Sequence, residues 1–315
     1  MKKIVREFVV FLSLMMLTAC NGGLDEFTVA VSPPAQEPGN TAAISSPAEA
    51  GESTVPEQQR DDVPGHEERE IWCDKGGQEI YGIASIPKGK GKFPLVIFSH
   101  GLASTHEDGK MYADRLVAEG VAVYSFDFCG GADDSKSDGM TTEMSVMTEA
   151  EDLRTVLDAA KTWDFVDTNK IVLMGLSQGG LVSAIAAAKW EDEIAGLILC
   201  YPAFLLQEEV HGIFKNREDI PDTNFYRGIT VGRKYFEDVW EYNVYDEIAK
   251  YKKKVLLLHG DEDQTVDISY SERAAKVYAD VEFYPIGGAN HFFSDEALDE
   301  AYQHITKYLR EIGVI

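Results

Sequence analysis

Residues 170–189 read KIVLMGLSQGGLVSAIAAAK, an apolar run, a glycine-rich turn and an alanine-rich run in immediate succession. The run Ile171–Met174 is short and rich in β-branched residues, which is typical of a buried strand in a parallel sheet. The alanine- and leucine-rich run has high helix propensity. Between them, Gly175-Leu176-Ser177-Gln178-Gly179 matches the pattern G-x-S-x-G. A strand that passes directly into a helix needs a sharp turn, so we expect Ser177 to be held above the sheet edge.

The two glycines of this motif, Gly175 and Gly179, leave room for the turn because neither carries a side chain. The next amide, the N–H of Gln178, would lie in the first turn of the helix, where backbone N–H groups have no acceptor within the helix. A raised hydroxyl beside a free amide suits a nucleophile and half of an oxyanion hole. The alternative is a glycine-rich turn with an ordinary serine, and the flanking strand and helix argue against it.

Composition narrows the classes of partner. The chain has 315 residues, which allows one large domain or two small ones, and it is 44% hydrophobic, which is enough for a sizeable core. Its formal net charge is −25, from 29 Lys and Arg against 54 Asp and Glu. This acidity disfavours nucleic acid as a partner and is typical of a soluble secreted or surface protein.

The N-terminus resembles that of a bacterial lipoprotein. The basic segment Met1–Arg6 precedes the apolar run Phe8–Leu17, which is too short for a membrane span and suits a signal peptide. The next residues, Leu17-Thr18-Ala19-Cys20, resemble a lipobox, which implies that residues 1–19 are removed and that acyl chains on Cys20 anchor the protein outside the cytoplasm. Plain secretion after cleavage near Ala19 is the alternative.

We interpret residues 20–66 as a lipidated cysteine followed by a tether. The segment Asn21–Gly65 is rich in Pro, Ser, Thr, Ala and Glu and has no hydrophobic periodicity, so we expect it to be disordered. Three cysteines remain beyond it, namely Cys73, Cys129 and Cys200. They form no C-x-x-C pair, so we expect no metal site and at least one free thiol, with a disulfide at Cys73 left open and a buried thiol favoured at Cys200.

Residues 67–315 alternate strands and helices, which predicts a mostly parallel sheet flanked by helices. An antiparallel hairpin is expected first, from residues 68–74 and 78–86. Later strands are expected at 95–98, 121–128, 171–174, 195–200, 255–258 and 281–285, and helices at 108–119, 149–163, 177–189, 269–279 and 295–312.

Residues 202–254 interrupt this alternation. The segment is polar with interspersed aromatic residues and is too long for a simple connection, so we interpret it as a lid insert after the strand that follows the Ser177 turn. Its part Arg227–Glu237 could contain a small hairpin. The aromatic side chains would line an acyl or aryl pocket, or they would form a small core of the lid insert itself, and both interpretations stay open.

A serine nucleophile needs a base and a group that orients the base. His291 lies in the loop after the last expected strand, and Asp263 follows the strand 255–258 in the pattern H-G-x-x-D-x-x-V. Asp261 and Asp267 are rivals for the acid. His100 follows a buried strand, and we expect it to brace its loop rather than to act as the base. We expect His304, inside the closing helix, at the surface.

Residues from about 70 to 315 resemble the α/β-hydrolase superfamily, and more narrowly the bacterial cinnamoyl/feruloyl esterase-like and serine aminopeptidase-like hydrolases. The resemblance is carried by KFPLVIFSHG, FDFCGG with SKSDG, GLSQGG, LLLHGDEDQTV and GANHFF. It implies the α/β-hydrolase fold with a lid, the chain order Ser177, Asp263, His291 for a catalytic triad, and the N–H groups of Leu102 and Gln178 as the oxyanion hole. Leu176 departs from the pattern, because many relatives have histidine before the serine.

The resemblance implies a serine carboxylesterase that works through an acyl-enzyme and needs no cofactor. Feruloyl, cinnamoyl or acetyl esters of plant polysaccharide are the substrates that it suggests. A prolyl-oligopeptidase-like or aminopeptidase-like serine peptidase is the alternative within the enzymes. A lipoprotein that binds a ligand through a vestigial triad is the alternative from another class, since a fold alone does not decide function. The oligomeric state stays open.

Overall fold

The computed structural model describes residues 66–315. The expected signal peptide (1–19), Cys20 and all of the tether but its last residue lie outside the described residues, so those predictions stay predictions. Within residues 66–315, no helix combines the length and the apolar character that crossing a membrane requires. The thiols of Cys73, Cys129 and Cys200 are all free and buried, so the disulfide left open at Cys73 is not formed.

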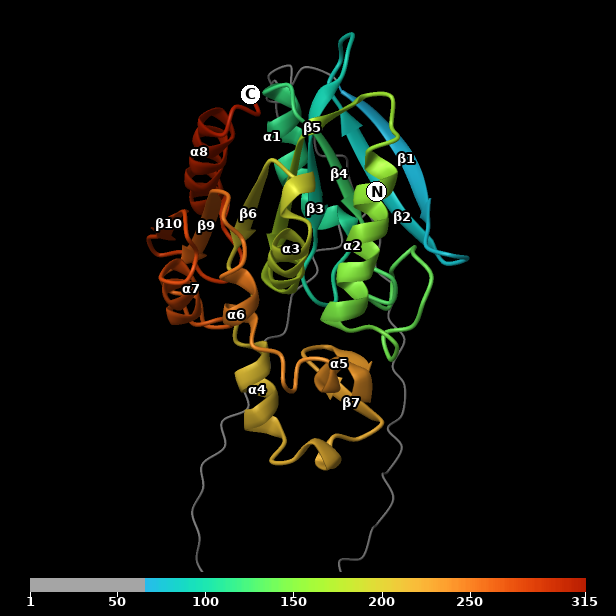
Figure 1. Ribbon diagram of the computed structural model, residues 1–315, viewed down its shortest axis with the longest axis vertical. Helices are drawn as coiled ribbons and strands as arrows, with labels where there is room; N and C mark the ends of the chain where they lie inside the picture. The colour runs from blue at the N-terminus through green and yellow to red at the C-terminus, as the bar shows by residue number, and fades with distance from the viewer. Residues whose placement is uncertain (1–65) are drawn as a thin grey trace, which may run out of the picture. The chain divides into compact units, whose positions relative to one another are not determined.

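The described part of the chain forms an eight-stranded sheet in the order β1-β2-β4-β3-β5-β6-β9-β10 (Figure 1). The first hairpin, β1 with β2, is antiparallel, β2 pairs antiparallel with β4, and every later pairing is parallel. The strands are β1 (Glu67–Asp74), β2 (Glu79–Ile86), β3 (Phe93–Ser99), β4 (Ala122–Phe126), β5 (Val166–Leu176), β6 (Gly196–Cys200), β9 (Val255–Gly260) and β10 (Val281–Ile286). The predicted mostly parallel sheet with an antiparallel N-terminal hairpin is confirmed.

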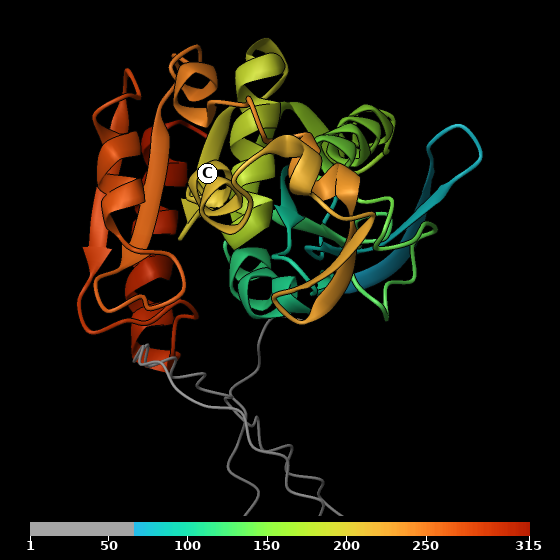
Figure 2. The ribbon, with the colours of Figure 1, turned by 90° about the horizontal axis from the view of Figure 1, so that it is seen from below.

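Helices cover both faces of this sheet, which explains why its central strands are apolar throughout (Figures 1 and 2). One face packs against α1 and α8, and the other against α2, α3 and α7. The side chains of Leu95–Phe98 and Ile171–Met174 are fully buried between these layers. The helices are η1 (His106–Gly109), α1 (Lys110–Ala118), α2 (Val146–Ala160), α3 (Ser177–Lys189), η2 (Glu191–Glu193), α7 (Ser269–Ala275) and α8 (Asp295–Glu311).

Helix α3 lies very close to strand β3, and glycine makes this possible. A Cβ atom at Gly179 would overlap the carbonyl groups of Ser99 and His100, and one at Gly175 would overlap the carbonyl group of Gly179. These are rigid backbone atoms, so a side chain at either position would push the helix away from the sheet. The flanking glycines of the G-x-S-x-G motif therefore fix where the first turn of α3 begins.

The substitution Gly179→Ala is expected to destabilise the protein by about 1–3 kcal/mol, because overpacking against backbone forces the helix to shift. Urea unfolding followed by circular dichroism would measure it. Gly212→Ala is a matched control, since a Cβ atom at Gly212 meets nothing within 4 Å. Equal stability of the two variants would contradict this account of the turn.

The lid insert, residues 202–254, lies between β6 and β9 as predicted (Figure 1). The predicted hairpin at Arg227–Glu237 is wrong in its limits. The hairpin spans residues 223–232, because Arg227 and Gly228 form its turn with φ angles of 46° and 101°. Residues Arg233–Glu237 are helical instead. The elements of the insert are α4 (Leu206–Ile213), η3 (Arg217–Asp219), β7 (Thr223–Tyr226), β8 (Ile229–Gly232), α5 (Arg233–Glu237) and α6 (Val244–Ile248).

Several aromatic side chains of the insert pack on one another. Tyr226, Tyr235 and Phe236 form mutual ring contacts with centroid distances of 5.2–5.5 Å, and Phe214 lies 5.1 Å from Phe236. All four are buried. These four residues therefore form a small core of the lid insert itself, which is the second of the two interpretations offered from the sequence.

Candidate active site

Three side chains from distant parts of the chain form one hydrogen-bonded series. The Oγ atom of Ser177 lies 3.0 Å from Nε2 of His291, and Nδ1 of His291 lies 2.7 Å from Oδ2 of Asp263. Ser177 follows β5, Asp263 follows β9 and His291 follows β10. Because these strands are parallel, their carboxyl ends lie at one edge of the sheet, and the three loops meet there.

The rival carboxylates bind elsewhere. Asp261 accepts a hydrogen bond from the N–H of Gly288 at 2.6 Å, and Asp267 accepts one from the N–H of Ser269 at 2.9 Å. His304 is half-buried rather than at the surface, with its ring stacked on that of Tyr284 at 3.7 Å. The structure therefore brings together Asp263 and His291, the acid and the base preferred from the sequence. Neither Asp261 nor Asp267 contacts His291 in place of Asp263.

Ser177 adopts a backbone conformation that is rare for a residue with a side chain. Its φ angle is 50°, in the left-handed region, although it begins a right-handed helix. The carbonyl oxygen of Ser177 accepts the N–H of Ala203 at 2.9 Å, which ties the turn to the start of the lid insert. Backbone strain of this kind is held in place by its surroundings and is concentrated at functional sites.

Asp263 is held as a carboxylate by several donors. Its side chain is buried, and its Oδ1 atom accepts the N–H groups of Thr265 and Val266 at 2.8 and 2.9 Å. Burial alone would raise its pKa, but the hydrogen bonds from His259 and His291 and the Val266 amide hold the pKa of Asp263 well below its usual value. The carboxylate is therefore ionised at neutral pH and can stabilise a positive charge on His291.

His259 is a positioning residue that sequence reasoning did not identify. It is fully buried, and its Nε2 atom lies 3.1 Å from Oδ2 of Asp263 and 2.9 Å from the carbonyl oxygen of Val266. Its Nδ1 atom lies 2.7 Å from Oγ of Ser271 in α7. The ring therefore fixes the Asp263 loop to α7. The histidine of H-G-x-x-D was visible in the sequence, but its burial against the aspartate four residues later was not.

His100 braces the loop after β3, as predicted. Its Nδ1 atom lies 2.7 Å from the carbonyl oxygen of Gly101, and its Nε2 atom accepts the N–H of Phe128 at 3.1 Å. These partners require a neutral ring with the proton on Nδ1, and burial lowers the pKa of His100 accordingly. The loop that His100 braces lies close to Ser177: a Cβ atom built on Gly101 would be 3.4 Å from Cβ of Ser177.

Two backbone N–H groups are available beside Ser177. No acceptor within residues 66–315 takes the N–H of Leu102, the residue after Gly101. The N–H of Gln178 lies in the first turn of α3, where the helix itself offers no acceptor. Among the described residues neither predicted donor has a partner, and both lie in segments that meet at the serine, so they suit stabilisation of an oxyanion.

The side chain of Gln178 joins the active site to the lid insert. Its Nε2 atom donates to Oε2 of Glu149 in α2 at 2.9 Å, and its Oε1 atom accepts the hydroxyl of Tyr235 in α5 at 2.6 Å. All three side chains are at least 97% buried. Burial, together with the nearby charge of Asp152, raises the pKa of Glu149 well above its usual value, although the hydrogen bond from Gln178 acts in the opposite direction.

We expect Glu149→Gln to stabilise the protein at neutral and alkaline pH. A glutamate whose pKa is raised by folding binds more protons in the folded than in the unfolded state. Stability therefore falls as pH rises above the unfolded pKa, by up to about 1.4 kcal/mol per pH unit until the folded pKa is reached. The amide introduced by Glu149→Gln keeps an acceptor for Nε2 of Gln178, and it removes the pH dependence of stability because an amide does not titrate. Thermal unfolding of both proteins from pH 4 to pH 9 would measure it, and parallel curves would contradict it.

Aromatic rings lie beside His291. The ring of Tyr201 lies 4.7 Å from the His291 ring, and that of Phe292 lies 5.2 Å from it. Tyr201 is buried, whereas Phe292 is 71% exposed, which is unusual for a large apolar side chain. This places an exposed aromatic surface next to the reactive groups.

The solved structures identify this architecture. Est1E from Butyrivibrio proteoclasticus with bound ferulic acid superposes with a TM-score of 0.70 and 29% identity, over 77% of this chain and 99% of that one. The chain has the α/β-hydrolase fold. Within this α/β hydrolase, residues 92–227 match the sequence model of the family described as serine aminopeptidase, S33. The predicted resemblance to feruloyl esterase-like and serine aminopeptidase-like hydrolases is confirmed.

Curated relatives of this α/β hydrolase match over shorter segments. The quorum-quenching protein AidA of Acinetobacter baumannii is 30% identical over 107 residues, which are 33% of this chain and 34% of AidA. Protein bem46 of Schizosaccharomyces pombe is 30% identical over 132 residues, which are 42% of this chain and 39% of bem46. The chain therefore matches only about a third to two fifths of the length of these relatives.

Proposed function

We propose that this α/β hydrolase is a serine carboxylesterase with Ser177 as nucleophile, His291 as base and Asp263 as the orienting acid. The observation that carries the proposal is the hydrogen-bonded series from Oγ of Ser177 through His291 to a buried, ionised Asp263. An alcohol is a weak nucleophile at neutral pH, and this arrangement is the one that activates it.

The proposed reaction has two acyl-transfer steps. His291 takes the proton of Ser177 as Oγ attacks the ester carbonyl, and the N–H groups of Leu102 and Gln178 stabilise the oxyanion. His291 then gives that proton to the departing alcohol, which leaves an ester on Ser177. Water attacks this ester with His291 again as base, and the acid product leaves with Ser177 restored. Asp263 stabilises the cationic ring in both steps.

We propose esters of aromatic acids, such as feruloyl or cinnamoyl esters, as substrates, with acetyl esters as smaller candidates. Two observations support this class. The Est1E structure holds ferulic acid and aligns along 99% of its length, and Phe292 presents an exposed aromatic ring beside His291. The lipid anchor at Cys20, which would hold the enzyme outside the cytoplasm on a membrane, is part of the proposal.

A serine aminopeptidase is the second candidate, favoured by the family match over residues 92–227. The two functions differ in the leaving group, which is an alcohol for the esterase and an amine for the peptidase. Comparison of kcat/KM for methyl ferulate and p-nitrophenyl acetate with that for aminoacyl p-nitroanilides separates them.

We expect the esters to be hydrolysed at least about 100-fold more efficiently than the anilides, since discrimination of this size needs only a few kcal/mol of differential transition-state binding. A preference for the anilides would favour the aminopeptidase. Hydrolysis of neither class by the folded protein would favour a ligand-binding lipoprotein that keeps the triad without using it.

A further inference from the structure

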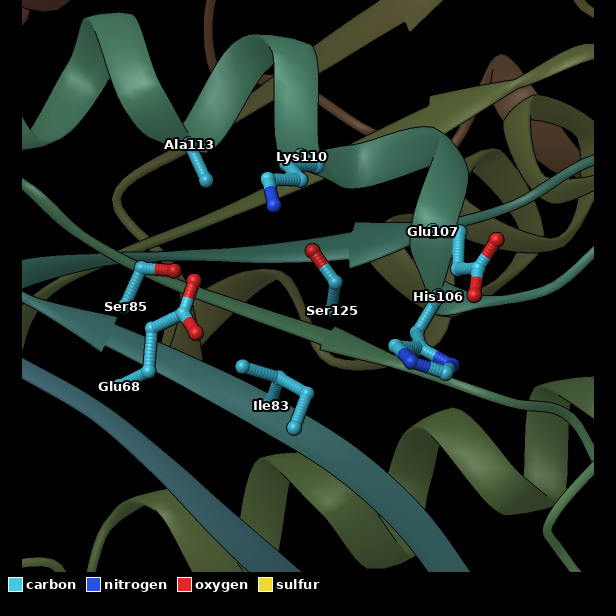
Figure 3. A pocket seen from close by; sticks show the side chains of 8 residues that line it. All are labelled: Glu68, Ile83, Ser85, His106, Glu107, Lys110, Ala113 and Ser125. Carbon is cyan, nitrogen blue, oxygen red and sulfur yellow. The ribbon is translucent and has the colours of Figure 1, made fainter. Parts of the chain in front are cut away.

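A pocket lies beneath α1, at the end of the sheet opposite to β9 and β10 (Figure 3). Its volume is about 430 Å³. Strands β1, β2 and β4 form one side of it and the η1–α1 segment forms the other. The lining residues are Glu68, Ile83, Ser85, His106, Glu107, Lys110, Ala113 and Ser125. Asp263 and His291 lie in loops that follow β9 and β10, the last two strands in the order of the sheet. None of the three triad residues lines this pocket, so it is separate from the triad.

Two hydroxyl groups on the strand side of the pocket have no partner in the described part of the chain. Ser85 and Ser125 are 6% and 5% exposed, yet neither hydroxyl makes a hydrogen bond with any of residues 66–315. Figure 3 shows both side chains directed into the space below α1. Because these hydroxyls face the pocket and have no partner within residues 66–315, each can donate to and accept from a ligand bound there.

His106 adds an imidazole that is held in a fixed orientation. Its Nδ1 atom lies 2.7 Å from Oδ1 of Asp127, which also accepts the backbone N–H of His106 at 2.7 Å. Burial would raise the pKa of Asp127, but the hydrogen bonds from His106 outweigh it and hold the pKa of Asp127 below its usual value. The Nδ1 side of the ring therefore faces an ionised carboxylate, and none of the described residues bonds to Nε2, which can bond to a ligand.

The charged groups of the pocket are at its rim. Glu68, Glu107 and Lys110 are exposed, and neither Glu107 nor Lys110 forms an ion pair within residues 66–315. Two carboxylates and one ammonium give the rim an excess of one negative charge, which disfavours an anionic ligand, while the ammonium of Lys110 opposes a cationic one. An apolar ligand would leave the hydroxyls of Ser85 and Ser125 without a partner. The mixed lining matches a neutral ligand that carries many donors and acceptors.

We propose that this pocket binds a neutral sugar residue. Hydroxyl groups of the sugar would donate to Glu68 and to Nε2 of His106, and they would accept from Lys110 and from the hydroxyls of Ser85 and Ser125. A ligand with several adjacent hydroxyls satisfies such a mixed set because each hydroxyl both donates and accepts.

On the same face of the sheet, the buried ring of Tyr81 separates His106 from an exposed aromatic residue, Trp72. The ring of Tyr81 lies 5.0 Å from that of His106, and the ring of Trp72 lies 4.8 Å from Tyr81 and is half exposed. An exposed indole presents a flat apolar surface together with an N–H donor. This surface suits the C–H face of a second sugar unit, so the ligand is a disaccharide or a longer glycan rather than a free monosaccharide.

Saturation-transfer NMR on the full chain tests the proposal with xylobiose and cellobiose as neutral probes and D-glucuronate as a charged one. We expect the disaccharides to bind with dissociation constants on the order of 1–10 mM. Ser125→Ala should weaken this binding about fivefold to tenfold through the loss of one hydrogen bond. Ala113→Leu should abolish it, because Ala113 is buried and its enlarged side chain would fill the pocket.

Ala118→Leu is the matched control, since Ala118 is exposed on the same helix and does not line the pocket. It should bind like the wild type, as should Ser177→Ala, because the triad takes no part. Circular dichroism confirms the fold of each variant. Three outcomes would overturn the proposal: no transfer to either disaccharide, unchanged binding in both Ala113→Leu and Ser125→Ala, or binding of glucuronate alone. Loss of esterase activity has no bearing on any of them.

Discussion

Ser177→Ala is expected to lower kcat for ester hydrolysis by about 10⁴- to 10⁶-fold, as loss of the nucleophile does in serine hydrolases whose residues act as a unit. The change removes one oxygen atom that hydrogen-bonds to His291. The residue keeps its positive φ angle, and alanine tolerates that conformation no better than serine. We therefore expect the melting temperature to stay within a few degrees. Stopped-flow or steady-state assays with p-nitrophenyl acetate would measure the loss of activity.

The control for Ser177→Ala is a second serine that is not at the reactive turn. Ser183 lies on the same helix and is buried, and its hydroxyl has no partner among the described residues. We expect Ser183→Ala to keep wild-type activity. A fluorophosphonate probe should label the wild type and Ser183→Ala but not Ser177→Ala. Labelling of the Ser177→Ala protein at another serine, with its hydrolysis intact, would remove Ser177 from the mechanism.

Asp263→Asn is expected to lower kcat by about 10⁴-fold, because an amide favours the wrong tautomer of the histidine and does not stabilise its cation. The site adds a second reason. Oδ2 of Asp263 faces the His259 and His291 rings. Its Oδ1 atom accepts the N–H groups of Thr265 and Val266. An amide has one oxygen and one NH2 group, so in either orientation its NH2 group would face donors on one of these two sides. Steady-state assays with p-nitrophenyl acetate would measure the loss.

Asp261→Asn is the matched control, two residues away in the same loop. Asp261 is exposed, and its Oδ1 atom contacts the N–H of Gly288 rather than a histidine. An amide oxygen can accept that hydrogen bond, so the variant should retain activity within about threefold, in line with the small effects of surface substitutions. A similar loss in both variants would show that the loop as a whole matters, and not the carboxylate at residue 263.

The sequence carried the parts of this structure that depend on local pattern. Apolar runs such as Ile171–Met174 are strands because both faces of the sheet are covered, and the loop after each strand could be located from its glycines and polar residues. The order of Ser177, Asp263 and His291 along parallel strands then implied that they meet at one edge. The choice of Asp263 over Asp261 and Asp267 followed from the spacing to His259.

Contacts between distant side chains could not be predicted in this way. The bonds of Gln178 to Glu149 and Tyr235 join three helices that periodicity places separately. The pocket beneath α1 depends on the distance between α1 and the strands β1, β2 and β4, which no local pattern encodes. The hairpin of the lid insert was misplaced because aromatic residues are enriched in strands, whereas Tyr235 and Phe236 lie in helix α5 and pack in the insert's own core.

The bond between Tyr235 and Gln178 makes the position of the insert and the geometry of the oxyanion donor interdependent. If α5 moved away from Gln178, the amide oxygen of Gln178 would lose the hydrogen bond from Tyr235, deep inside the protein and next to Glu149, whose pKa is raised by burial. Such an opening would cost about 1–3 kcal/mol for each polar group left alone. The hydrogen bond from Tyr235 therefore favours the arrangement in which the insert stays attached to Gln178, the residue whose backbone N–H is a proposed oxyanion donor.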